Sequence, residues 1–121
     1  LPKHIQLTCA KFLNSQTSSI EEIRNKYRVR LERVYRELSE SQSLIPSRPN
    51  SSIYCFVDVS PTGFSGEEFA TQLLVSENVA VCPGNGFGRS GENSVRISVS
   101  GDEKDLTEGL TRLVKFASNK G

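Results

Sequence analysis

One arginine within a short alternating strand has the residue type and position that best suit binding chemistry. The segment SVRISVS, residues 94–100, alternates apolar and polar residues with a period of two. Val95, Ile97 and Val99 lie on one face, which other elements must cover. Arg96 lies on the other face, where it either stays in solvent or binds an anion in a site. A planar guanidinium suits the second role because it donates two parallel hydrogen bonds to a carboxylate, and the residues alone leave both alternatives open.

The segment before this strand is rich in glycine. Residues 86–91, GFGRSG, match the dinucleotide-binding pattern G-x-G-x-x-G letter for letter. That pattern binds a pyrophosphate only where a helix follows, because the phosphates rest on the helix N-terminus. Here a strand follows, so the sequence predicts a flexible connector between strands and not a dinucleotide site. So many glycines also suit a close approach of the backbone to a ligand.

Other reactive side chains lack the partners that catalysis or metal binding needs. The only histidine, His4, lies far from most of the serines, and no G-x-S-x-G segment occurs. The three cysteines, Cys9, Cys55 and Cys82, form no CxxC pair, so no metal site is predicted. We expect Cys55 and Cys82 to be buried free thiols, which suits a reducing compartment such as the cytosol. Asp58, between a strand and a turn, is expected to act as a cap.

A long helix is predicted over residues 19–40. Apolar residues recur along it at three- and four-residue steps, namely Ile20, Ile23, Tyr27, Leu31, Val34 and Leu38. Its other face is basic, with Arg24, Lys26, Arg28, Arg30, Arg33 and Arg36. Glutamates interleave these cations, and Glu32 with Arg36 has the i,i+4 spacing of a surface pair. We therefore favour a solvated face, or one packed against another domain, over a nucleic-acid interface.

The remaining helices are predicted from apolar stripes and caps. Residues 3–14 form a short helix with Ile5, Cys9 and Phe12 on one stripe, and Ser18 with Glu21 has capping-box spacing before the long helix. Ser65 and Glu68 repeat that spacing at the start of a helix to about residue 77, which we expect to bury Phe69, Leu73 and Leu74. Asp102 caps a last helix that carries Leu106, Leu110, Leu113 and Phe116.

Strands are predicted at residues 53–59, 79–82 and 94–100, with a brief edge strand at Leu44 and Ile45. From residue 53 the order is β-α-β-β-α. The first two strands, joined through a helix, should lie parallel, and the last two antiparallel. The predicted fold class is α/β, with a small mixed sheet covered by helices and preceded by the long helix.

The composition is typical of a globular chain, and the small net charge creates no strong electrostatic field. The 121 residues are 36% hydrophobic and 24% charged, with a net charge of +1. We expect no nucleic-acid partner from this charge, and no membrane span because no apolar run approaches about 20 residues. No secretory signal is recognised at the start, and the lack of methionine suggests a piece of a longer chain.

Three segments, in order and spacing, resemble the C-terminal small domain of class I/II aminotransferases, enzymes of fold type I that use pyridoxal 5'-phosphate (PLP). They are VAVCPGNGFG at 79–88, VRIS at 95–98 and DLTEGL at 105–110. The resemblance covers residues 49–117. It implies two parts: residues 1–40, the end of the large domain and the interdomain helix, and residues 41–121, the small domain.

The resemblance also implies a role for Arg96. In the family, the arginine of this strand binds the α-carboxylate of the amino-acid substrate, and a loop that corresponds to Gly84, Asn85, Gly86 and Phe87 shapes the pocket. The implied reaction transfers an amino group from an amino acid to a 2-oxo acid, with PLP as the electron sink. The Schiff-base lysine belongs to the large domain, so this chain carries no catalytic residue and is expected to be inactive alone. The implied partners are that large domain and a second subunit in a homodimer, and we expect the protein in the cytoplasm.

The chain also departs from the family pattern. Ser51 and Ser52 stand where the family usually has a glycine and a small residue, and Gly84-Asn85-Gly86 differs from the usual loop, so side-chain specificity is not assigned. Two other functions stay open. One is a lyase or synthase of the same fold type, since it needs the same carboxylate contact. The other is a non-catalytic ligand-binding or interaction module.

Overall fold

The computed structural model describes residues 2–15 and 17–120, except the side chains of Thr17 and Ser18. The described residues form helices α1 (Lys3–Ser15), α2 (Thr17–Ser39), α3 (Gly66–Glu77) and α4 (Glu103–Ser118), and strands β1 (Ile45–Pro46), β2 (Tyr54–Asp58), β3 (Cys82–Pro83) and β4 (Ser94–Ser98). Three short 3₁₀ turns are η1 (Ser60–Thr62), η2 (Gly84–Phe87) and η3 (Arg89–Gly91). The α/β class and the small helix-covered sheet are confirmed.

The sheet differs from the prediction in its pairing. Its strand order is β1-β2-β4-β3, and β4 pairs antiparallel with both β2 and β3. β2 and β3 therefore run parallel to each other, as expected across α3, but β4 lies between them. Every neighbouring pair is antiparallel, so the sheet is not mixed. β4 is an inner strand, and both of its edges are hydrogen-bonded.

The strand predicted at residues 79–82 is shorter in the structure, and it begins later in the sequence. β3 comprises only Cys82 and Pro83, at the edge of the sheet. Proline has no backbone N–H to donate, so it interrupts a ladder and is found on edge strands. The alternating residues Val79 and Val81 are instead packed against the core as partly buried side chains.

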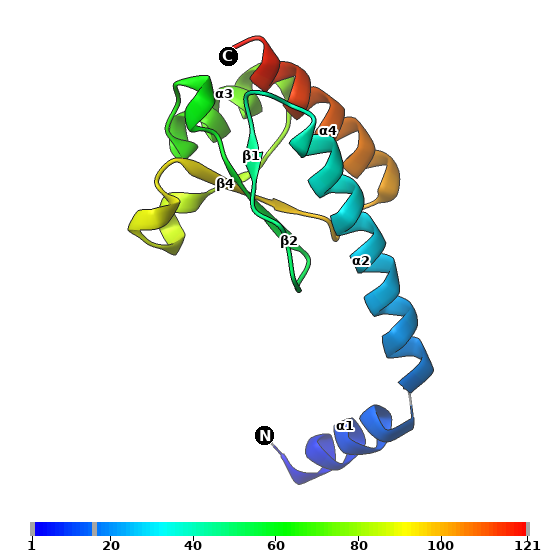
Figure 1. Ribbon diagram of the computed structural model, residues 1–121. Helices are drawn as coiled ribbons and strands as arrows, with labels where there is room; N and C mark the ends of the chain where they lie inside the picture. The colour runs from blue at the N-terminus through cyan, green and yellow to red at the C-terminus, as the bar shows by residue number, and fades with distance from the viewer. Residues whose placement is uncertain (1, 16, 121) are drawn as a thin grey trace.

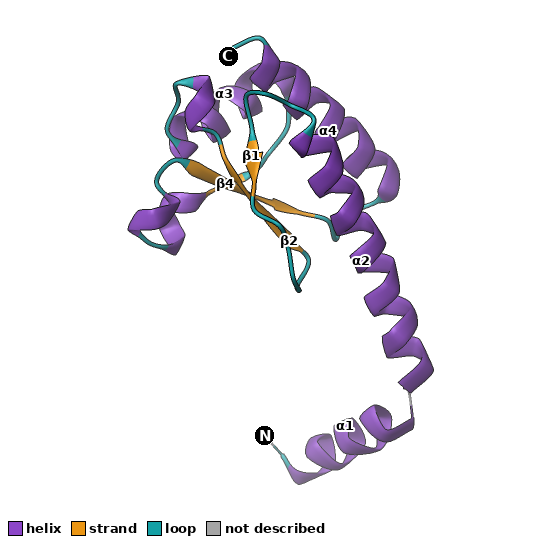
Figure 2. Ribbon diagram, viewed as in Figure 1, coloured by secondary structure: helices purple, strands orange, loops and turns teal. Residues whose placement is uncertain are grey.

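The core lies between one face of the sheet and the helices. Figures 1 and 2 show α2 and α4 crossing one side of the sheet, with α3 beside them. The sheet contributes alternate residues of β2 and β4 and the residue after each strand, which are Cys55, Val57, Val59, Val95, Ile97 and Val99. The helices contribute Leu31, Val34, Leu38, Phe69, Ala70, Leu73, Leu110, Leu113, Phe116 and Ala117. The predicted alternation of β4 is thus confirmed. Leu74 was expected in this core and is 51% exposed.

The first helix and the start of the second project away from this core. Figure 1 shows α1 and the start of α2 extending beyond the sheet. None of the described side chains of α1 is buried, including its predicted stripe of Ile5, Cys9 and Phe12. Ile20 and Ile23 in α2 are also exposed, and burial starts near Tyr27. The helices were predicted correctly, but these stripes have no covering element among the described residues.

Short polar contacts fix the ends of the elements. Ser65 and Glu68 form the predicted capping box, and two hydrogen bonds from Ser65, from its backbone N–H and its hydroxyl, hold the pKa of the Glu68 carboxyl below its ordinary value of 4.5. Asp102 accepts a hydrogen bond from the Lys104 backbone, and Asp58 accepts one from Ser60. The predicted cap at Ser18 concerns a side chain outside the described residues.

Arginines of α2 join this helix to α4. Arg30 donates hydrogen bonds to the carbonyl oxygens of Val99 (3.0 Å) and Gly101 (2.9 Å), and its Nε lies 2.7 Å from Glu103. Arg33 also pairs with Glu103. Two of the six cations of the predicted basic face are therefore used in packing within the chain, and the other four, Arg24, Lys26, Arg28 and Arg36, are exposed.

The predicted pair of Glu32 with Arg36 is not formed. Glu32 pairs with Arg28, one turn earlier, at 3.1 Å. Both pairings have i,i+4 spacing, so the helix pattern alone cannot choose between them.

Replacing Arg30 should weaken the fold more than replacing an exposed arginine. The Arg30 side chain is 10% exposed. In Arg30→Met, two backbone carbonyls and Glu103 lose a charged donor, so we expect the free energy of unfolding to fall by about 2 kcal/mol. Arg24 is 64% exposed and pairs only with Glu21 of its own helix, so Arg24→Met should cost under about 0.5 kcal/mol. Denaturant unfolding of both variants checks this, and equal losses would contradict it.

Candidate functional site

The face of the sheet opposite the helices carries aromatic residues and Arg96. On β2, Tyr54, Phe56 and Asp58 are half-buried and alternate with the core residues. The ladder places Phe56 directly opposite Arg96 of β4, and Cys82 of β3 opposite Arg96 on its other edge. This face therefore gathers a cation and rings from strands that are far apart in the sequence.

Two rings hold the guanidinium of Arg96. Its Cζ lies 4.1 Å from the ring centroid of Tyr54 and 4.6 Å from that of Phe87, over both rings. Phe87 in turn meets Phe56 edge-on, with centroids 5.5 Å apart and planes at 90°. Cation–π contacts of this kind are attractive, and stronger where water is excluded. Arg96 is thus half-buried and held against an aromatic patch, which we define as Tyr54, Phe56 and Phe87.

Arg96 has no anionic partner in the part of the chain that the structure describes. The other half-buried arginines there are Arg30, Arg33 and Arg112, and each pairs with a glutamate. No ion pair or side-chain hydrogen bond among residues 2–15 and 17–120 involves Arg96. Its N–H donors are therefore available to an anion. Among the two alternatives left open by the sequence, this arrangement favours an anion site.

The predicted pocket loop, residues 84–87, lies beside this site but only part of it contacts Arg96. Gly84 is buried, and a Cβ there would meet the backbone oxygens of Gly91 at 2.5 Å and Ser94 at 2.7 Å. The Asn85 amide donates to Glu67 of α3 at 3.1 Å, and Gly86 is exposed. Phe87 supplies the ring that lies under the guanidinium. Gly84 and Gly91 thus pack closely against each other's backbone, whereas Gly86 and Gly88 between them have open space.

Tyr54 and Phe56 were not among the predicted site residues. Their spacing puts both on one face of a strand, which the sequence does show. The missing information was the pairing of β2 with β4, because the sequence argument paired β2 with the strand after α3. Without that register, no sequence signal brought Tyr54 or Phe56 next to Arg96.

The cysteines support no reactive or metal site in the described residues. All three are free thiols, Cys55 is buried as predicted, and Cys82 is half-buried. Burial raises the pKa of the Cys55 thiol to about 11. Across residues 2–15 and 17–120, no group of His, Cys, Asp and Glu side chains is arranged to hold a metal ion. The same residues include no helix with the length and apolarity to cross a membrane.

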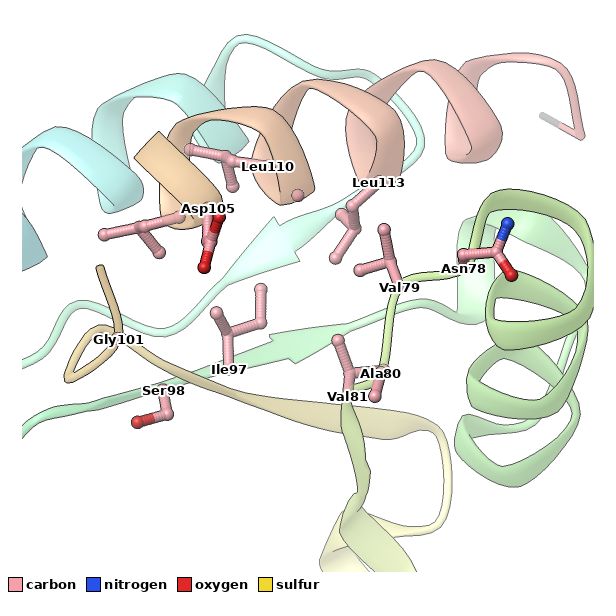
Figure 3. Close-up of a pocket in the computed structure, with 12 residues that line it drawn as sticks. Asn78, Val79, Ala80, Val81, Ile97, Ser98, Gly101, Asp105, Leu110 and Leu113 are labelled. Atoms are coloured by element: carbon pink, nitrogen blue, oxygen red, sulfur yellow. The ribbon is translucent and has the colours of Figure 1, made fainter. Parts of the chain in front are cut away.

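A separate hollow lies on the helix side of the sheet. It has a volume of about 310 Å³ and lies between α4, the end of β4 and residues 78–81. Figure 3 shows Ile97, Val79, Leu110 and Leu113 around it, with Ser98 on the other side of its strand. Since Ile97 and Arg96 point to opposite faces, this apolar hollow is not part of the Arg96 site.

Comparisons with known proteins identify chains of similar sequence and fold. The chain is 35% identical over 118 residues to an aspartate aminotransferase of Pyrococcus abyssi and 34% identical to aromatic-amino-acid aminotransferase 2 of Thermococcus litoralis, each over 96% of this chain. A crystal structure of an aromatic aminotransferase from Pyrococcus horikoshii superposes with a TM-score of 0.87 at 32% identity, over 95% of this chain and 31% of that one. The chain spans about 30% of the length of these curated relatives.

The fold and the site together define a small α/β domain with an arginine held on an aromatic sheet face. The family model for aminotransferase class I and II matches residues 1–113. The chain belongs to this family, and it corresponds to about 30% of the length of the relatives that it matches.

The family implies PLP, and the described residues do not supply its covalent site. The lysines Lys3, Lys11, Lys26, Lys104, Lys115 and Lys120 are all exposed. They lie on the helices or, for Lys120, after α4, and none belongs to a strand of the face that carries Arg96. A Schiff-base lysine must face the reacting group, so these residues do not fit that role.

The loop packing predicts unequal effects of two glycine substitutions. In Gly84→Ala the new methyl group would overlap backbone oxygens, so we expect a loss of about 1–3 kcal/mol in the free energy of unfolding. Gly86 has nothing within 4 Å of its added Cβ, so Gly86→Ala should change stability by under about 0.5 kcal/mol. Thermal unfolding compares the two, and a stable Gly84→Ala variant would show that the packing is wrong.

The raised pKa of Cys55 predicts low reactivity. At pH 8 a thiol with a pKa of about 11 is almost entirely protonated, and it is also buried. We expect iodoacetamide to alkylate the exposed Cys9 and to leave Cys55 unmodified until the chain is denatured. Mass spectrometry of peptides before and after denaturation checks this. Alkylation of Cys55 at the rate of Cys9 in the folded chain would contradict it.

Proposed function

We propose that this chain is the C-terminal portion of a PLP-dependent aminotransferase, which moves an amino group from an amino acid to a 2-oxo acid. Arg96 binds the α-carboxylate of the substrate. The observation that carries this proposal is the half-buried guanidinium of Arg96, which rests on two rings and has no carboxylate partner among the described residues. The relatives support the reaction class, because they are named as aminotransferases.

Arg96 would orient the substrate in this reaction. A carboxylate that accepts two parallel hydrogen bonds from a guanidinium is fixed in direction as well as in position. The amino group of the substrate, one carbon away, is then directed to the reacting centre, which lowers the entropic cost of the reaction. The rings of Tyr54 and Phe87 keep water from part of the guanidinium, so the ion pair is stronger than in bulk solvent. PLP, when bound, supplies the electron sink.

The rest of the parent protein would complete the site. We propose that residues 1–40 are the end of the large domain and the interdomain helix, and that residues 41–121 are the small domain. The exposed stripes of α1 and of the start of α2 suit contact with a further domain, since they are apolar and uncovered among the described residues, and α2 from about Tyr27 packs on the small domain. The large domain would hold PLP and its lysine, so this chain alone would be inactive. Gly84, Asn85, Gly86 and Phe87 would shape the entrance of the pocket.

The family membership also suggests the oligomeric state, the metabolic role and the compartment of the parent enzyme. We propose a homodimer that works in amino-acid metabolism, and the free thiols fit a reducing compartment such as the cytoplasm. A lyase or synthase of the same fold type would use Arg96 in the same way. Product analysis of the full-length enzyme with an amino acid and a 2-oxo acid separates these reactions.

Loss of Arg96 in the full-length enzyme tests the proposal. Charged hydrogen bonds contribute about 1.5–3 kcal/mol each, so Arg96→Ala should raise KM for the amino acid by about 10²–10⁴-fold. The PLP absorbance of the enzyme should persist. Arg89, an exposed cation in the neighbouring turn η3, is the control, and Arg89→Ala should change KM by under about threefold. An unchanged KM in Arg96→Ala would exclude this role.

A further inference from the structure

We infer that Phe87 and Tyr54 are positioning residues, which hold the guanidinium of Arg96 so that its N–H donors face an incoming carboxylate. The inference rests on the proposed function of Arg96 and assigns the aromatic patch a role in it. The inference is based on the ring centroids of Tyr54 and Phe87, which both lie within 4.6 Å of the Cζ atom of Arg96. Neither ring accepts a conventional hydrogen bond, so both hold the cation without a competing carboxylate.

The chemistry of the contact explains why rings suit this position. Arginine carries five N–H donors and a flexible stem, and a free side chain samples many rotamers. A carboxylate of the protein would fix the guanidinium but would also occupy its donors, as Glu103 does for Arg30 and Arg33. A ring attracts the cation electrostatically through its π-system and leaves hydrogen-bond donors unsatisfied. Arg96 is therefore ordered before the substrate arrives, which reduces the entropic cost of binding.

Phe87 is itself held in place from two sides. Its ring packs edge-on against Phe56, which lies directly opposite Arg96 in the β2–β4 ladder. Its backbone ends η2, which starts at the closely packed Gly84, and Gly88 follows with φ of 122°, a value that favours glycine. The ring of Phe87 is nevertheless 51% exposed. An exposed ring held this firmly against a cation is better explained by a positioning role than by core packing.

A competing explanation is that Phe87 only covers apolar surface. Leu74 of α3 is also 51% exposed, and it has no aromatic ring that could attract an arginine. It is therefore a matched control. If Phe87 acts through its ring on Arg96, a tyrosine should replace it and a leucine should not. If it acts through apolar area, leucine should suffice.

The experiment measures the full-length enzyme with Phe87→Leu, Phe87→Tyr and Leu74→Ala. We expect Phe87→Leu to raise KM for the amino acid by about three- to thirtyfold, with kcat within about twofold of the wild type. Phe87→Tyr and Leu74→Ala should stay within about twofold in both. The dissociation constant of an unreactive carboxylic acid, which has the substrate side chain but no amino group, should rise with KM. Calorimetry provides this second readout.

A double substitution shows whether Phe87 acts through Arg96. In Arg96→Met the cation is absent, so adding Phe87→Leu should change kcat/KM by under about twofold. An equal loss from Phe87→Leu with and without Arg96, or equal losses in Phe87→Leu and Phe87→Tyr, would overturn the inference while the role of Arg96 stands. An unchanged KM in Arg96→Met would overturn the proposed function instead. If Phe87→Leu does not fold, Tyr54→Leu against Tyr54→Phe makes the same comparison on the second ring.

Discussion

The alternation of β4 between a buried and an open face is the constraint on which the site depends. Val95, Ile97 and Val99 are buried under the helices, and the pleat then directs Arg96 to the opposite face. A shift of the register by one residue would bury a guanidinium in the core, at a cost that no pairing there offsets. The hydrophobic core therefore determines the face on which Arg96 lies.

The arginines of this chain show how their surroundings divide one residue type between two tasks. Arg30 and Arg33 bind Glu103 and join α2 to α4, so their charge is neutralised within the fold. Arg96 rests on Tyr54 and Phe87, which order it without neutralising it. The difference lies in the partner and not in the arginine. A carboxylate accepts hydrogen bonds from the N–H donors, whereas an aromatic ring leaves these donors free to bind an anion.

The first helix and the start of the second differ from the rest of the described chain in having no buried apolar face. They carry apolar stripes with helical spacing, yet Ile5, Phe12 and Ile23 are exposed. Such stripes are normally covered, because their burial provides most of the stability of a helix in a protein. The chain spans about 30% of the length of its curated relatives, and burial in α2 begins near Tyr27, so the second half of this helix belongs to the core.

The sequence by itself determined the elements that depend on local pattern: the helices, the alternation of β4, the caps at Ser65 and Asp102, and Arg96 as the candidate anion-binding residue. Only the tertiary structure decided what depends on contacts between distant segments. It placed β4 between β2 and β3, brought Tyr54 and Phe87 onto Arg96, and fixed the glycine turn through backbone packing. Periodicity records which face of a strand is buried, but it carries no information on which strand becomes its neighbour.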